Sequence, residues 1–197
     1  MNGVARTNTR DIARAAVRAE LAQVAFELFR TQGFEKVTVN DLAEAAGVSR
    51  STFLRYFGSK EDAILGAVGA QGEQIAAALL ARPADEDDWT ALRRALDAIL
   101  EHHRQDPSGA LAVSRLIMQT PALCARSQEK QTGWRPAIAQ ALAERTGPSR
   151  PAGLSPLVRA AAAVDCLNIA VNHWTAADGR LDLDELLDEA FAALTPR

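Results

Sequence analysis

The stretch TVNDLAEAAGVSRSTFLRYF (residues 38–57) predicts two short helices joined by a glycine turn. Thr38 stands three residues before Asp41, the spacing at which a hydroxyl and an acid cap the start of a helix reciprocally. Gly47 can take the left-handed conformation that ends a helix, and Ser49 can cap a second helix two residues later. The stretch therefore predicts a helix-turn-helix.

The second of these helices has one buried and one free side. Phe53 and Phe57 lie four residues apart and are predicted to face inward. In a helix-turn-helix, the first residues of the second helix lie against base edges in the major groove of DNA. Residues 49–56 are therefore expected in the groove, with these side chains on the free sides: Ser49, Arg50, Ser51, Thr52, Leu54 and Tyr56.

Charge is divided unevenly along the chain. The 197 residues carry a net charge of −3 and are 48% hydrophobic, enough for a sizeable core. Residues 1–60 hold nine Lys and Arg against six Asp and Glu, whereas residues 61–197 hold thirteen against nineteen. A capped helical corner alone also fits an ordinary helical protein, but this division favours a DNA-binding domain over 1–60 and a separate acidic domain over 61–197.

The chain outside the opening stretch shows helical periods and no strand alternation. We predict an all-α fold of about nine helices, three of them in the N-terminal domain, after a disordered tail over residues 1–9. Pro136 lies inside one predicted helix and is expected to kink it. The helices are expected at 9–31, 38–46, 49–57, 59–80, 88–105, 108–119, 121–145, 155–177 and 182–194.

Residues 155–177 are apolar on more than one face, and one chain covers only one side of such a helix easily. We therefore predict a homodimer in which the last two helices pair across a two-fold axis. The candidate interface residues are Ala161, Val164, Leu167, Val171, Leu187 and Phe191.

Metal, cofactor and membrane signals are weak. Cys124 and Cys166 lack a C-x-x-C spacing, and the adjacent His102 and His103 point about 100° apart on a helix, so neither a metal site nor a disulfide framework is expected. Residues 1–20 contain no apolar signal segment, and no later run approaches the ~20 apolar residues of a membrane span. We expect a cytoplasmic protein with no cofactor, no metal and no membrane partner.

The sequence resembles the tetracycline-repressor (TetR) family of bacterial one-component regulators over residues of about 10–65. The matching residues are Ala25, Phe29, Gly33-Phe34, Thr38-Val39, Leu42-Ala43, Ala46-Gly47-Val48-Ser49, Thr52-Phe53, Tyr56-Phe57 and Ser59-Lys60-Glu61. The resemblance implies binding to a double-stranded DNA operator. It places Arg50, Ser51, Thr52, Tyr56 and Lys60 at DNA-contacting positions and Thr38 against a phosphate.

Two further features bear on these contacts. Lys60 opens the helix that Ser59 caps, where an ammonium opposes the helix dipole, and this placement favours a phosphate contact. Leu54 departs from the family, which often carries an aromatic residue there. Leucine offers only apolar contact, for instance to a thymine methyl group.

In the C-terminal part, the stretch from Gln119 through Trp134 to Trp174 is similar to the branch of the family whose regulatory domains bind acyl-coenzyme A-like ligands, a branch that includes regulators associated with mycofactocin clusters. The effector is expected between the middle helices, where an apolar stripe is otherwise ordinary core packing. Trp134 is the preferred wall residue because its ring also carries one donor. The full candidate set is Leu96, Leu100, His103, Ile117, Met118, Trp134 and Ile138.

These features predict a homodimeric, ligand-responsive repressor of a partly palindromic operator. No G-x-S-x-G, H-E-x-x-H or phosphate-loop motif is present in the sequence, so an enzyme is not expected. The alternatives are an enzyme on the same fold, or a helical protein-binding adaptor that retains the fold without binding an operator.

Overall fold

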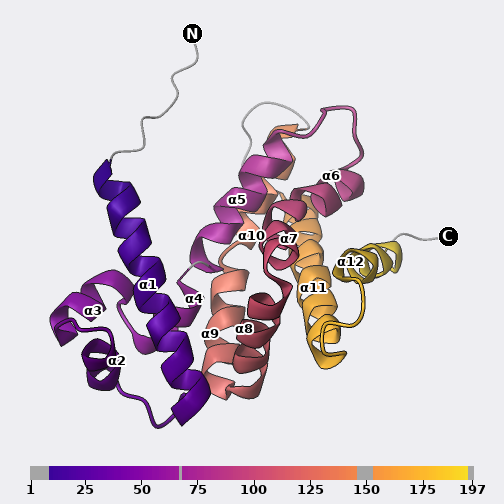
Figure 1. Ribbon diagram of the computed structural model, residues 1–197. Helices are drawn as coiled ribbons and strands as arrows, with labels where there is room; N and C mark the ends of the chain where they lie inside the picture. Colours follow the sequence, from indigo (N-terminus) through magenta and orange to yellow (C-terminus); the bar gives the residue numbers. More distant parts are fainter. Residues whose placement is uncertain (1–8, 67, 146–152, 195–197) are drawn as a thin grey trace. The chain divides into compact units, whose positions relative to one another are not determined.

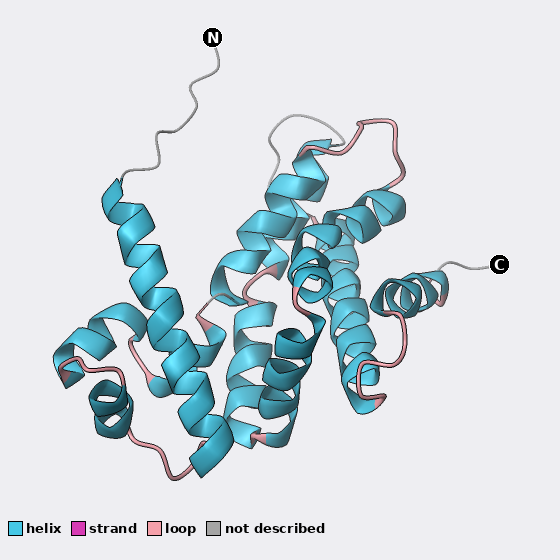
Figure 2. Cartoon of the chain, viewed as in Figure 1, coloured by secondary structure: helices cyan, strands magenta, loops and turns pink. Residues whose placement is uncertain are grey.

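The computed structural model describes residues 9–66, 68–145 and 153–194, and the regular structure within these ranges is helical with no strand (Figures 1 and 2). The all-α prediction is confirmed. Most of the tail expected over residues 1–9 lies outside the described residues. The chain divides into two compact units, Met1–Gly66 and Ala67–Arg197, which we call unit 1 and unit 2.

Unit 1 consists of one long helix and three short ones. These are α1 (Thr9–Gln32), α2 (Val39–Ala45), α3 (Arg50–Phe57) and α4 (Lys60–Leu65). Gly33 and Gly47 have positive φ values of 87° and 65°, so the two turns that bracket α2 use the left-handed conformation that glycine adopts without strain. Phe34 packs back on Phe29 with ring centroids 4.8 Å apart.

Unit 2 contains the remaining helices of the described chain. Three predicted helices are each divided in two, at Gly66, at Leu96 and at Gly133-Trp134, so the nine expected helices correspond to twelve segments. The helices of unit 2 are α5 (Val68–Leu80), α6 (Asp88–Ala95), α7 (Asp97–Gln105), α8 (Pro107–Gln119), α9 (Pro121–Thr132), α10 (Arg135–Arg145), α11 (Leu154–Ala176) and α12 (Leu183–Ala192).

Pro136 does not kink a helix, contrary to the prediction. It is the second residue of α10, because α9 ends at Thr132 and a turn at Gly133-Trp134 separates the two helices. Proline is tolerated in a first helical turn, where its missing N–H has no intrahelical partner to lose.

The core of unit 2 is built around the contact of α5 with α10, which lie side by side (Figure 1). Trp134 is buried just before α10, and its indole N–H donates to the carbonyl of Val68 at 2.8 Å. Gly72 of α5 faces this ring so closely that an added Cβ would lie 2.7 Å from Trp134 Cδ1. The absence of a side chain at Gly72 therefore lets α5 approach α10.

Two stretches are long and apolar enough, by length and composition alone, to cross a membrane: Lys60–Leu80 and Leu154–Ala176. The second is α11, and it packs within unit 2 against α6, α8, α10 and α12. The central helix of a helical core can be equally long and apolar. The prediction that no run approaches the length of a membrane span is therefore wrong for these two stretches.

Replacing Gly72 with Ala is expected to reduce the free energy of unfolding by about 1–3 kcal/mol, since the new methyl group must displace Trp134 or separate α5 from α10. Chemical denaturation monitored by circular dichroism measures the change. A stability equal to that of the wild type would contradict the close packing.

Candidate functional site

The start of α2 is capped as the sequence predicts. Asp41 N–H donates to Thr38 Oγ1 at 3.3 Å, and Thr38 N–H donates to Asp41 Oδ2 at 2.8 Å. The hydrogen bond that the Thr38 N–H donates to the carboxylate, and then the one from the Thr38 hydroxyl, lower the pKa of Asp41. Thr38 is exposed, but its hydroxyl also donates to Asp41 at 2.8 Å, so its first function in the fold is to begin α2.

Three hydroxyl groups gather at the start of α3. Ser49 is the N-cap, and its Oγ accepts a hydrogen bond from Thr52 N–H at 3.1 Å. The same Oγ lies 3.0 Å from Ser51 Oγ and 2.9 Å from Thr52 Oγ1. Ser51 and Arg50 are exposed, so the N-terminal turn of α3 presents a hydroxyl and a guanidinium on a helix end whose dipole favours an anion.

The orientation of α3 is fixed by its two phenylalanines. Phe53 is 0% exposed and Phe57 is also buried, with ring centroids 5.0 Å apart. Leu54 and Tyr56 flank this face and are half-buried. The inward positions predicted from the sequence are therefore occupied as expected.

Arg55 was missed by the sequence interpretation. It is exposed, lies four residues after Ser51 and so continues the outward face of α3 by one turn. The four-residue spacing could have identified it. Arg55 follows Ser51 on the outward side of α3 at the same spacing at which Phe57 follows Phe53 on the inward side. Ser51 and Arg55 therefore share the outer face of α3, and the guanidinium of Arg50 is exposed at the start of the same helix.

Lys60 makes contacts within unit 1 that were not predicted. Its Nζ donates to the carbonyl oxygens of Phe34 at 3.0 Å and of Val37 at 3.3 Å, and it lies 4.2 Å from the centroid of the Phe34 ring. Two of its three N–H donors are thus occupied within unit 1. Lys60 therefore holds the loop that precedes Thr38, and its phosphate contact stays a prediction for the remaining N–H donor.

The candidate effector residues divide into a buried and an exposed group. Leu96, Leu100, Trp134 and Ile138 belong to the hydrophobic core of unit 2. Ile117 is half-buried on α8, whereas Met118 at the end of that helix is 43% exposed and is not brought to this core. The indole N–H of Trp134, expected as a free donor, is taken by Val68.

His103 lies at the edge of the same region. Its ring is 5.7 Å from that of Trp174 in an edge-on arrangement, and its Nδ1 is 3.4 Å from the carbonyl oxygen of Ile99. Burial lowers the pKa of His103, and the Ile99 hydrogen bond opposes this effect only in part. A neutral imidazole near pH 7 follows, which suits an apolar surrounding.

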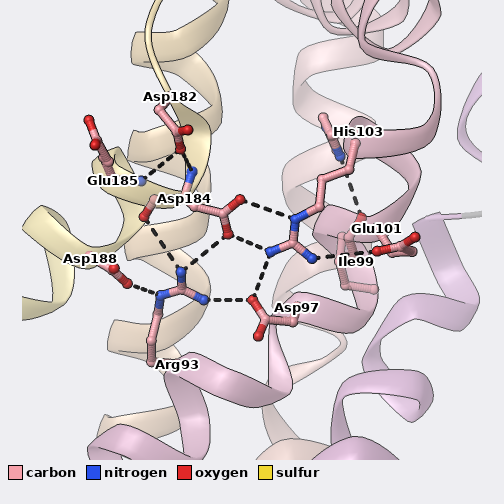
Figure 3. A network of polar contacts seen from close by, with 10 residues as sticks. Arg93, Asp97, Ile99, Glu101, His103, Asp182, Asp184, Glu185 and Asp188 are labelled. Atoms are coloured by element: carbon pink, nitrogen blue, oxygen red, sulfur yellow. Dashed lines mark hydrogen bonds and ion pairs between the residues drawn. The ribbon is translucent and has the colours of Figure 1, made fainter.

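A network of charged side chains joins α12 to α6 and α7 (Figure 3). Arg93 of α6, 11% exposed, forms ion pairs with Asp97 at 2.8 Å, with Asp184 at 3.3 Å and with Asp188. Arg104 of α7 also bonds Asp97 and Asp184, both through its Nη2. The hydrogen bond from Arg104 lowers the pKa of Asp184, so this carboxylate is charged at any pH near neutrality. The start of α12 is therefore tied to two helices at once.

The predicted dimer residues are mostly core residues of their own chain. Val164, Leu167, Leu187 and Phe191 are buried within unit 2, because α12 and the other helices of the unit already cover that side of α11. We therefore correct these four assignments. Ala161 and Val171 are half-buried.

The outward side of α11 carries a different apolar set. Val158 is 58% exposed and Ile169 is 63% exposed, and Leu154 and Leu157 are also exposed. With Ala161, Ala162 and Asp165 these residues follow spacings of three and four, so they form one stripe along the helix. We call Val158, Ala161, Ala162, Asp165 and Ile169 the outer stripe of α11.

Cysteine and metal chemistry have little support in the described part of the chain. Over residues 9–66, 68–145 and 153–194, no group of three or more His, Cys, Asp or Glu side chains is placed to hold a metal ion. Cys166 is buried and donates to the carbonyl of Ala190 at 3.5 Å, and burial raises the pKa of its thiol. Such a cysteine packs as a small apolar residue.

A capped helix-turn-helix with an outward basic and hydroxyl face, joined to a second all-helical unit, defines a helix-turn-helix DNA-binding regulator as the class. Comparison with family models agrees. The family described as "Bacterial regulatory proteins, tetR family" matches residues 21–66, and the "MftR C-terminal domain" matches residues 86–197. The chain belongs to the TetR family of bacterial regulatory proteins, and it is a DNA-binding transcriptional regulator.

Among relatives, MftR of Mycobacterium tuberculosis, named for a regulatory role in mycofactocin biosynthesis, is 32% identical over 90% of this chain and 89% of its own length. The HTH-type transcriptional regulator TcmR of Streptomyces glaucescens is 38% identical over 66% of this chain, which spans 60% of that relative.

Among solved structures, FadR of Thermus thermophilus, a TetR-family repressor in complex with lauroyl-CoA, matches with a TM-score of 0.57 at 23% identity, over 91% of this chain and 96% of that one. FadR of Bacillus subtilis, in complex with stearoyl-CoA, matches with a TM-score of 0.58 at 19% identity, over 89% of this chain and 96% of that one. At these identities the two structures establish the fold.

Thr38→Ala is expected to reduce the free energy of unfolding by ~1 kcal/mol, because it removes the cap of α2. Denaturant melts compared with the wild type measure the loss. Thr31→Ala is the control in the same unit, since that exposed hydroxyl only bonds carbonyls of its own helix. A cap effect no larger than that of Thr31→Ala would argue against the capping box as the start signal.

Proposed function

We propose that this protein is a homodimeric repressor in which each subunit places the outer face of α3 in one major groove of a partly palindromic operator. The observation that carries the proposal is the rotation of α3. Burial of Phe53 and Phe57 turns Ser51 and Arg55 outward, and Arg50 is exposed at the helix end that enters a groove. Arginine suits bidentate bonding to guanine, and a hydroxyl suits a base or a phosphate.

The remaining candidate contacts are weighed by their surroundings. Thr52 and Leu54 lie beside the outer face, where a half-buried side chain can still meet a base edge or a thymine methyl. Thr38 and Ser49 are exposed caps that can reach phosphate while serving their helices. Tyr56 is half-buried and suits a backbone contact. Lys60 acts indirectly by fixing the loop before α2.

The effector is proposed to be a small apolar or acyl-type molecule bound within unit 2. Two FadR structures that share the fold over about 90% of this chain hold lauroyl-CoA and stearoyl-CoA. The apolar side chains of Leu96, Leu100 and Ile138 suit an acyl chain. Binding there would favour a geometry of the dimer that fits the operator less well, a coupling of typically about 1–3 kcal/mol.

Dimerisation is proposed through the outer stripe of α11. Val158 and Ile169 are exposed apolar side chains on a helix whose other side is buried in its own core, and such a surface can be covered by a second copy. A two-fold axis across α11 would set the stripe against itself, as an isologous interface requires. The symmetric operator then matches the symmetric protein.

The competing functions make different predictions. A protein-binding adaptor would bind no operator, and an enzyme would turn over substrate without DNA. The named relatives are transcriptional regulators, which supports a non-enzymatic role and a place in the bacterial cytoplasm, where operator DNA lies. A binding assay with the intergenic DNA next to the protein's own gene, together with mass spectrometry of what co-purifies, separates the three.

Arg50→Ala is expected to weaken binding to the operator about 10- to 100-fold, equivalent to the ~1–3 kcal/mol of a lost base contact, and to affect unrelated duplex DNA much less. Fluorescence anisotropy with both duplexes at one salt concentration measures the two losses. Arg94→Ala, an exposed arginine of α6 in unit 2, is the matched control. Equal losses on both duplexes would assign Arg50 to the backbone, and no loss on either would contradict the proposed reading face.

Val158→Asp with Ile169→Asp is expected to convert the dimer into a folded monomer at micromolar concentration, because two carboxylates would be buried in an apolar contact. Sedimentation velocity measures the mass. Leu181→Asp, at a position off α11 that is 42% exposed, should leave the dimer intact. A wild-type protein that sediments only as a monomer would refute the dimer.

A further inference from the structure

A hollow of about 500 Å³ opens within unit 1 between α1 and the last turn of α3. It is lined by Arg10, Ala13, Arg14 and Val17 of α1 and by Arg55 and Tyr56 of α3. The four residues of α1 follow spacings of three, four and seven, so they form one stripe of that helix. Two elements of unit 1 thus contribute side chains to one concave surface.

The lining combines apolar side chains with guanidinium groups. Ala13, Val17 and the Tyr56 ring supply the apolar part, and Val17 remains 40% exposed. Three arginines lie around them, and none of the described residues that line the hollow carries a carboxylate. Guanidinium groups keep their charge at any physiological pH and bond phosphate oxygens in pairs. The chemistry therefore fits an anion that also has an apolar surface.

Two of these arginines are available to such an anion. Among the residues that the structure describes, Arg14 and Arg55 take part in no hydrogen bond or ion pair within the chain. Arg18, one turn further along α1, is by contrast held 5.2 Å from the centroid of the Phe57 ring. The charge of Arg14 and Arg55 is thus not satisfied by the fold itself.

The position of Arg55 indicates an extended anion. Arg55 lines the hollow and also continues the outer face of α3 one turn beyond Ser51. A polyanion that passes along this face reaches Ser51 and the hollow in succession, whereas a compact anion fills the hollow alone. Deoxyribose between two phosphates supplies the apolar surface that Val17 and Tyr56 can contact.

We propose that the hollow holds the sugar–phosphate backbone of one DNA strand, with Arg14 and Arg55 as phosphate contacts and with Val17 and Tyr56 packed on deoxyribose. The proposal rests on the proposed function and adds α1 to the DNA-contacting surface. Contacts of this kind strengthen binding without regard to sequence, since phosphates carry no sequence information directly. Arg10 shares the lining and contributes to the same positive field.

The first test removes charge. Arg14→Gln with Arg55→Gln should lower the slope of log affinity against log salt by about two, at about 0.9 per phosphate contact, equally on operator and unrelated duplexes. Arg30→Gln with Arg94→Gln is the matched control, with Arg30 at the far end of α1 and paired with Glu27. Its slope should remain that of the wild type, and thermal melts of both variants should coincide with the wild type.

The second test fills the hollow without changing charge. Ala13→Trp, at an exposed helix position, should weaken binding to both duplexes while the melting temperature is unchanged. Tyr56 is the single tyrosine of the sequence, so fluorotyrosine labelling gives one ¹⁹F resonance located at the hollow. That resonance should shift on adding duplex DNA and should remain unshifted on adding millimolar phenyl phosphate.

The outcomes separate this proposal from the one on which it rests. An unchanged salt slope for the Arg14 and Arg55 variant, with Arg50→Ala still weakening the operator, overturns the hollow as a DNA site and leaves the operator function standing. A saturable shift of the Tyr56 resonance with phenyl phosphate, again with an unchanged salt slope, identifies a small-anion site and also overturns it. A wild-type protein that binds neither the operator nor unrelated duplex DNA refutes the operator function itself.

Discussion

Burial of Phe53 and Phe57 is the constraint on which the candidate DNA surface depends. An eight-residue helix with two inward rings four residues apart has one rotation that buries both, and a shift of one residue would turn the helix by about 100°. That rotation directs Ser51 and Arg55 outward. The caps at Thr38 and Ser49 set where α2 and α3 begin. The first residue of α3 is therefore fixed by its cap, and the burial of the two rings then fixes its rotation. Lys60 contributes by bonding the Phe34 and Val37 carbonyls just before α2.

How far the sequence predicts the molecule depends on how local each interaction is. The caps at Thr38 and Ser49 use partners three residues away, and both were predicted correctly. The bonds of Lys60 were not predicted, because its partners lie 23 and 26 residues away and are backbone atoms, which no spacing identifies. Helix α11 is apolar around its circumference, so periodicity could not tell Val164, which is buried, from Ile169, which is exposed. Only the packing of neighbouring helices distinguishes its two sides.

Unit 2 combines a closed apolar core with a charged attachment of its last helix. Trp134 fills the space that Gly72 leaves on α5, and its N–H is satisfied by Val68. The Arg93 network is only partly exposed and contains several carboxylates around two arginines, which makes each pair depend on the others. Arg93 of α6 is mostly buried and is paired with carboxylates of α12, so the loss of one carboxylate would leave it with fewer partners. Because these pairs hold the two helices together, α12 and α6 are expected to move together.

This arrangement constrains how an effector can act. Leu96, Leu100 and Ile138 are at most 1% exposed, so no water-sized space adjoins these side chains. An acyl chain that touches them must displace packed neighbours, because a core packed at crystal-like density contains no free space for a ligand. The ligand then binds a packing different from this one, and the free energy of that rearrangement is subtracted from its affinity. Since Leu96 lies between Arg93 and Asp97, a rearrangement at Leu96 also disturbs the ion pairs that fasten α12. An effector that enters beside Leu96 would therefore act on the attachment of α12 directly, with no separate relay required.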